Sequence, residues 1–163
     1  MVGIEPNPGP QASTVPSPTP CFNMGVINAR SIVNKSVLIH DIITDNHLDI
    51  LAVTETWVYD NSSDVHKKEA APDGFSITHY HRITASGGSE KQNGGGVALI
   101  HRENIRVRLI KINPSLTLTF ELLIAKIANW SIGLTLAVIY RPPGPKSNPA
   151  EFADELSNLI DTH

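Results

Sequence analysis

A strand–helix–strand pattern near the start of the chain constrains its architecture most strongly. Residues 48–54 form a short apolar run rich in β-branched side chains, which favours a buried strand over a helix. Residues 22–28 alternate as a strand does. Between the two runs, apolar residues recur at helical spacing from the expected N-cap Asn34 to about Asn46. Two strands joined by a helix predict an α/β fold in which the helix packs on one face of a sheet.

The rest of the chain consists of short strand-like runs and one final helix. We expect strands at residues 75–82, 97–100, 105–112, 116–127 and 131–140. Their close spacing favours antiparallel hairpins. Residues 60–74 form a polar stretch with no clear period. The last helix has Asn148 as its expected cap, Pro149 at its first position and one apolar stripe along its length.

Composition and charge place the chain in the globular class. Its 163 residues are enough for about one domain, and 40% of them are hydrophobic. The net charge of −3 excludes a histone-like DNA binder. Residues 82–111 nevertheless carry six Lys and Arg against two Glu, which suits either a contact with a DNA backbone or an ordinary solvated face.

The single cysteine, Cys21, excludes an internal disulfide framework. The sequence has no signal-peptide pattern, and no apolar run approaches the roughly 20 residues that cross a bilayer. We therefore expect an intracellular protein without a membrane segment.

The first twenty residues differ from the rest, because they hold six of the twelve prolines. Proline removes amide donors and restricts φ, so residues 1–20 are predicted to be an extended, disordered leader, and the folded part is predicted to begin at Cys21. Residues 3–10, GIEPNPGP, are similar to the 2A-type ribosome-skipping peptide, with Gly3 in place of its aspartate. A proline-rich linker is the alternative interpretation.

Three polar residues stand where predicted buried strands end: Asn28, Glu55 and Tyr140. In layered α/β folds that edge of a sheet is where ligands bind. A carboxylate at the edge of a hydrophobic core is unfavourable unless it is paired or binds a cation. The hard oxygens of Glu55 suit Mg²⁺. The Asn28 amide can donate to a phosphate oxygen or accept from a metal-bound water. Taken singly, the three residues also fit a turn former, a cap and a half-buried core edge.

Four short motifs follow one another along the chain. They are NARS at 28–31, TETW at 54–57, GGGVA at 94–98 and YRPP at 140–143. Over residues 22–163 the chain resembles the endonuclease domain of non-LTR (LINE-type) retrotransposons. That domain belongs to the endonuclease/exonuclease/phosphatase superfamily, together with apurinic endonucleases. The resemblance implies a four-layered α/β sandwich of two packed sheets.

The resemblance also implies an activity, which is Mg²⁺-dependent (or Mn²⁺-dependent) hydrolysis of a DNA phosphodiester. The nick in target DNA would prime reverse transcription in the nucleus, by a reverse transcriptase domain further along the parent protein. On the matched motifs, Glu55 would be a metal ligand, Asn28 would contact the metal and phosphate, and Tyr140 would hydrogen-bond the scissile phosphate.

The chain departs from this family in lacking its later Gly-Asp-Phe-Asn and Ser-Asp-His motifs. We interpret Asp161 and His163 as the end of a solvated helix. The chain is therefore expected to be an N-terminal portion of the domain, with open sheet edges and little or no nuclease activity alone. The alternatives are a non-catalytic binding module, a retrotransposon remnant and, less favoured by the YRPP motif, a superfamily phosphatase.

Two further patterns, a glycine run and a pair of histidines, have no role in the expected nuclease activity. The glycines at 94–96 lack the Gly-Lys-Ser/Thr of a phosphate-binding loop, so we expect them to let strands approach closely. His79 and His81 lie two apart on a predicted strand and share a face, which suits a metal pair or ordinary surface histidines.

Overall fold

The computed structural model describes residues 21–58, 64–80, 94–113, 117–128, 133–144 and 148–162. The expected leader at residues 1–20, residues 81–93 with His81 and the start of the basic stretch, and His163 lie outside these ranges. The described elements are β1 (Met24–Asn28), α1 (Ser36–Asp45), β2 (Ile50–Thr54), α2 (Asp64–Ala70), β3 (Phe75–Tyr80), β4 (Val97–Arg102), β5 (Val107–Ile110), β6 (Glu121–Ile127), β7 (Leu134–Tyr140) and α3 (Pro149–Thr162).

Two sheets form the centre of the molecule. The first has the strand order β1-β2-β4-β3, in which β1 and β2 are parallel and the other pairs are antiparallel. The second is the antiparallel sheet β5-β6-β7. Helix α1 connects the two parallel strands, which confirms the strand–helix–strand expectation.

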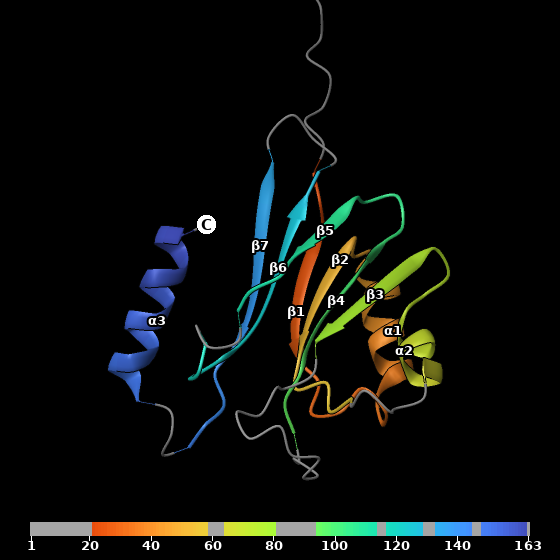
Figure 1. Ribbon diagram of the computed structural model, residues 1–163. Helices are drawn as coiled ribbons and strands as arrows, with labels where there is room; N and C mark the ends of the chain where they lie inside the picture. The colour runs from red at the N-terminus through yellow and green to blue at the C-terminus, as the bar shows by residue number, and fades with distance from the viewer. Residues whose placement is uncertain are drawn as a thin grey trace, which may run out of the picture.

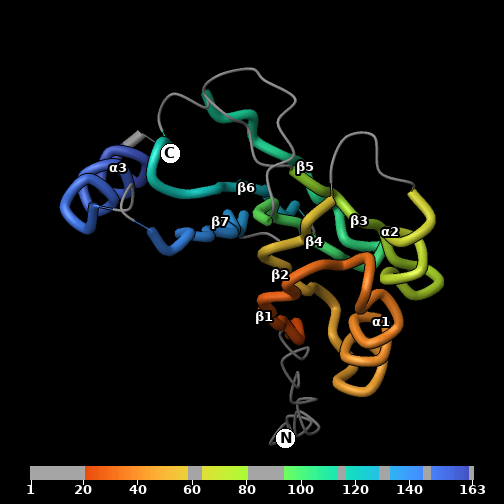
Figure 2. Tube along the Cα trace, turned by 90° about the horizontal axis from the view of Figure 1, so that it is seen from below, coloured from red at the N-terminus to blue at the C-terminus, as the bar shows by residue number. Residues whose placement is uncertain are grey.

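The sheets and helices stack in four layers. Helices α1 and α2 cover the outer face of the first sheet, and α3 packs on the outer face of the second sheet (Figures 1 and 2). The two sheets face each other across an apolar core. The expected four-layered α/β sandwich is confirmed. No helix in the described ranges is both long enough and apolar enough to span a bilayer.

Strand β2 shows how the layers are joined. Its residues Leu51 and Val53 belong to the core beneath the helices, whereas Ile50 and Ala52 belong to the core between the sheets. All five residues of β2 are buried. A strand covered on both faces needs a continuous apolar run, which is the pattern seen at 48–54.

Helix α3 is attached to the second sheet by both apolar and polar contacts. Leu159 and Phe120 share a small core, and the Phe120 and Phe152 rings meet edge to face at 5.4 Å. The backbone N–H and hydroxyl of Thr119 both donate to Glu155 Oε2, at 3.0 and 2.7 Å. These contacts draw the residues just before β6 toward α3, so this strand begins at Glu121 and not at 116 as predicted.

The predicted cap of the first helix is wrong, whereas that of the last helix is confirmed. Helix α1 begins at Ser36 with Lys35 at the N-cap and no side-chain capping bond. The Ser36 hydroxyl instead donates to Glu69 Oε2 of α2 at 2.5 Å. The Ser36 side chain thus bonds to α2 and caps no helix N–H, and a backbone bond from the Lys35 N–H to the Ile32 carbonyl at 2.9 Å precedes the helix. At α3, Asn148 Oδ1 does accept from the Ala150 N–H at 3.0 Å.

Helix α2 lies in the stretch whose sequence shows no clear period. Only Ala70 of its seven residues is buried, and it packs into the core beneath α1. Lys67 Nζ donates to Asp64 Oδ1 at 2.9 Å across one turn. A helix this short depends on tertiary packing, so a period-based prediction misses it.

Each sheet has two edge strands, which pair on one side only among the described strands. These are β1 and β3 in the first sheet and β5 and β7 in the second. On β1, Val26 is 77% exposed and Met24 is 42% exposed. Both point to the side of the first sheet that faces the second, because Val26 pairs with Ala52 in register. Strand β1 therefore exposes apolar side chains on this face.

Candidate active site at the strand ends

The structure brings Asn28, Glu55 and Tyr140 to one end of the two sheets. Parallel pairing places Asn28 opposite Thr54, the residue before Glu55. Tyr140 ends β7 at the same edge (the lower end in Figure 1), and its hydroxyl donates a hydrogen bond to Glu55 Oε1. The bond joins residues 85 positions apart and links the second sheet to the turn after β2.

Asn28 is exposed at the end of β1. Its Oδ1 accepts a hydrogen bond from the Arg30 N–H at 3.3 Å, and the turn that follows carries positive φ values at Arg30 (48°) and Ser31 (107°). The Asn28 side chain therefore shapes the turn after β1, which lies beside the turn after β2 that carries Glu55. The turn-forming interpretation of Asn28 is confirmed.

The backbone at Glu55 has an uncommon conformation. Glu55 and Trp57 have φ values of 51° and 53°, on either side of Thr56. Left-handed conformations at residues other than glycine cost roughly 1–3 kcal/mol each and persist where the surroundings enforce them. Here the Glu55 carbonyl accepts from the Ser31 N–H at 2.9 Å, and the Thr56 carbonyl accepts from the Ile32 N–H at 2.8 Å. The turn after β1 thus fixes the backbone of the turn after β2 through these two hydrogen bonds.

The glycines at 94–96 hold the other side of the same turn. The Thr56 N–H donates to the Gly96 carbonyl at 3.1 Å, and the Trp57 N–H donates to the Gly95 carbonyl at 2.9 Å. Gly96 has φ +90°, and a Cβ there would lie 2.3 Å from Thr56 Oγ1. The expectation that these glycines permit close approach of strands is confirmed.

Thr56 is fully buried beneath this turn. Its Oγ1 lies 2.8 Å from His79 Nε2 in a hydrogen bond and 3.4 Å from the Gly95 carbonyl oxygen. His79 therefore supports the turn from β3. Its proposed pairing with His81 falls outside the described residues.

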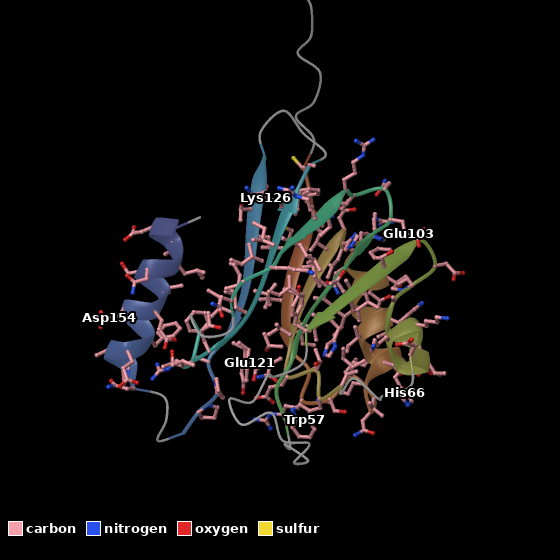
Figure 3. All side chains as sticks on the ribbon, viewed as in Figure 1. Trp57, His66, Glu103, Glu121, Lys126 and Asp154 are labelled. Carbon is pink, nitrogen blue, oxygen red and sulfur yellow. The ribbon has the colours of Figure 1, made fainter. Side chains whose placement is uncertain are left out.

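Sequence reasoning did not identify Glu121 as a site residue. Its Oε2 accepts a hydrogen bond from the Gly96 N–H, and it pairs with Tyr140 in the register of β6 and β7. Figure 3 shows Glu121 and Trp57 at the same end of the molecule. In the sequence, Glu121 is a carboxylate within the strand expected at 116–127, whose other charged residue is Lys126.

The oxygen donors at this edge are few. No group of three or more His, Cys, Asp or Glu side chains that could hold a metal ion occurs among the described residues. Glu55 offers a carboxylate, Asn28 an amide and Tyr140 a hydroxyl. Mg²⁺ commonly binds one or two carboxylates, keeps several waters and takes further ligands from substrate phosphates, so this donor set fits a partial magnesium site.

Comparison with known families gives the class of the protein. Residues 21–162 match the Endonuclease/Exonuclease/phosphatase family, so the chain belongs to that family. A comparison with curated protein sequences finds no significant match.

Solved structures share the fold at low sequence identity. The human Nocturnin catalytic domain with bound sulfate is 16% identical, with a TM-score of 0.56 over 84% of this chain and 57% of its own. The AP endonuclease LMAP from Leishmania major is 14% identical, with a TM-score of 0.50 over 73% of this chain and 39% of its own. The endonuclease domain of TRAS1, a telomere-specific non-LTR retrotransposon, is 11% identical, with a TM-score of 0.49 over 85% of this chain and 52% of its own. This chain thus spans about half the length of the structures that it matches, or less.

Proposed function

We propose that this chain is the N-terminal portion of a Mg²⁺-dependent DNA endonuclease domain of a non-LTR (LINE-type) retrotransposon. The observation that carries the proposal is the hydrogen bond from Tyr140 to Glu55, which joins the TETW and YRPP motifs at the edge where Asn28 ends β1. Family membership supports a hydrolase that acts on phosphate esters, and the order of the four motifs favours the retrotransposon branch.

The chemistry assigned to the three residues follows from their donor types. Glu55 would hold the divalent cation, Mg²⁺ or Mn²⁺, with the Asn28 amide directed at the metal-bound water or the phosphate. When bound, the cation stabilises charge that develops on the phosphoryl oxygens. The Tyr140 hydroxyl has one proton to donate, so a bound phosphate oxygen would compete with Glu55 for it.

The chain alone is proposed to be inactive, or nearly so. Its 163 residues lack the Gly-Asp-Phe-Asn and Ser-Asp-His motifs of the family that it resembles. A cooperating catalytic set that loses members usually loses most of its rate enhancement. The parent protein would supply those groups and a reverse transcriptase domain, would bind the DNA backbone, and would act in the nucleus.

A non-catalytic binding module is the second candidate. The exposed β1 residues Met24 and Val26 favour it, because exposed apolar surface on a sheet edge suits a protein partner. In that case Glu55 and a divalent cation would have no effect on binding.

Titration of the chain with Mn²⁺, followed by electron paramagnetic resonance, tests the assignment. We expect wild type to bind Mn²⁺ and Glu55→Ala to lose that binding. Glu103→Ala, an exposed carboxylate in the upper half of Figure 3, is the matched control. Equal binding by wild type and Glu55→Ala, or none by either, contradicts the proposed metal role. A plasmid-nicking assay in Mg²⁺ checks inactivity of the chain: nicking above the Glu55→Ala background would contradict it.

A further inference from the structure

Glu121 closes a ring of contacts around the candidate metal ligand. Its Oε2 accepts from the Gly96 N–H, and the Gly96 carbonyl accepts from the Thr56 N–H at 3.1 Å. Thr56 follows Glu55, whose Oε1 accepts from the Tyr140 hydroxyl. Tyr140 is in turn the register partner of Glu121 on β6 and β7.

The ring joins the two sheets at two points. One point is the bond from Tyr140 to the Glu55 side chain. The other is the bond from the Gly96 backbone to the Glu121 side chain, between residues 25 positions apart. A hydrogen bond to a carboxylate is stronger than one between neutral groups. Glu121 therefore holds the 94–96 segment, which in turn holds the turn that carries Glu55.

Gly96 is the residue that links Glu121 to the turn, because its N–H and its carbonyl each form one of the two hydrogen bonds. With φ at +90° it adopts a conformation that leaves its N–H directed at Glu121 and its carbonyl at Thr56. Because Gly96 is hydrogen-bonded to both residues, a shift of Glu121 would displace the backbone of Thr56. Without the Glu121 acceptor, the 94–96 segment keeps its bonds to the turn but loses this hydrogen bond to the second sheet.

We propose that Glu121 is a positioning residue for Glu55. It fixes where the Glu55 carboxylate is presented to a divalent cation, and it acts through the backbone of Gly96 and Thr56. This inference rests on the proposed function, because it assigns to Glu55 the role of metal ligand. Partners that orient a metal ligand typically change metal affinity by about 10- to 100-fold when they are removed.

Two substitutions separate positioning from direct metal ligation. Glu121→Gln keeps an oxygen that can accept the Gly96 N–H but removes the negative charge. Glu121→Leu removes both. Glu103→Leu is the matched control, since Glu103 is exposed and lies away from Glu121 and Trp57 in Figure 3. Circular dichroism establishes that each variant is folded.

The first readout needs no metal. Trp57 follows Thr56, and its indole lies 3.3 Å from the place where a Cβ on Gly94 would stand, so its emission reports the geometry of this turn. In a Trp130→Phe background, we expect Glu121→Leu to shift the Trp57 emission and to speed hydrogen exchange at the Gly96 and Thr56 amides. Glu121→Gln and Glu103→Leu should match the parent. Unchanged emission and exchange in folded Glu121→Leu would overturn the proposal.

The second readout is Mn²⁺ affinity. We expect Glu121→Leu to bind about 10-fold more weakly or worse, and Glu121→Gln to stay within about threefold of wild type. If Glu121→Gln loses affinity as fully as Glu121→Leu while Trp57 is unperturbed, Glu121 is itself a ligand and the positioning role is wrong. If wild type binds no Mn²⁺, the proposed function fails, and the Trp57 readout alone decides whether Glu121 positions the turn.

Discussion

The hydroxyl of Tyr140 donates a hydrogen bond to the carboxylate of Glu55, so the end of β7 in one sheet is tied to the turn after β2 in the other. The two residues belong to separate motifs, and Glu55 lies just after a strand of the first sheet whereas Tyr140 ends a strand of the second. Their contact places a phenol hydroxyl and a carboxylate at one edge of the sandwich, beside Asn28. This edge is also where Glu121 and the 94–96 glycines hold the backbone.

Replacing Tyr140 with Phe should lower the free energy of unfolding by about 1.5 kcal/mol. The change leaves the ring in place and removes only the donor to a charged acceptor. Urea denaturation measures it, with Tyr80→Phe as a control for the same chemical change in the other sheet. A loss no larger than that of the control would show that the bond contributes little to stability.

Replacing Gly96 with Ala should lower the free energy of unfolding by about 3 kcal/mol. The new Cβ would stand 2.3 Å from Thr56 Oγ1, and φ is +90°. Gly133→Ala is the matched control, because nothing lies within 4 Å of its Cβ position. That variant should stay within about 0.5 kcal/mol of wild type. If both variants are equally stable in thermal unfolding, the close approach at Gly96 is not a constraint.

Replacing Asp49 with Ala should lower stability but leave Mn²⁺ affinity unchanged. Asp49 Oδ1 accepts from Arg102 Nε at 2.7 Å, and Oδ2 accepts from the Asn23 N–H at 3.0 Å. These contacts lie just before β2, at the opposite end of that strand from Glu55. We expect a loss of about 1–2 kcal/mol in urea denaturation. Weakened Mn²⁺ binding in the folded variant would argue against independence of the two ends.

Stability should fall in acid partly through Glu69. The Ser36 hydroxyl donates to Glu69 and holds the pKa of that carboxyl below its ordinary value of 4.5, with His66 adding to the effect and burial opposing it. A lowered pKa means that this stabilisation is complete above about pH 4.5 and is lost as the pH falls through the folded-state pKa.

Ser36→Ala should therefore bring the pKa of Glu69 closer to 4.5. Carboxyl chemical shifts of Glu69, followed by NMR between pH 2 and pH 7, measure it directly. Asp64 provides an internal control, because its pKa is lowered mainly by the hydrogen bond from Lys67 and should not move. A Glu69 titration curve that is unchanged in Ser36→Ala would contradict the assigned cause.

Several elements could be predicted from local pattern because burial imposes that pattern. The apolar run at 48–54 marks a strand covered on both faces, and β2 is such a strand. Asn148 and Pro149 mark the start of a helix through backbone chemistry that operates within one turn. The placement of Asn28, Glu55 and Tyr140 at strand ends could be predicted in the same way, because each follows or ends a run of apolar residues.

Other features could not be predicted, because they depend on partners far apart in the sequence. Helix α2 has a single buried residue, Ala70, so it carries too little periodicity to detect. The Ser36 hydroxyl donates to Glu69 of another helix, 33 positions away, and no side chain caps α1. Glu121 bonds to Gly96 across two sheets, and no spacing rule links a strand's first residue to a glycine 25 positions earlier.

The sequence by itself indicated the strand–helix–strand unit and the polar residues at its strand ends, since a continuous apolar run marks a strand that is covered on both faces. The four-layered sandwich was implied by the family resemblance. Only the tertiary structure decided that Tyr140 bonds to Glu55 and that Glu121 holds the turn at Gly96. The physical reason is that a hydrogen bond forms between whichever donor and acceptor the packed sheets bring within reach, and packing of two sheets is set by the whole core rather than by any local run of residues.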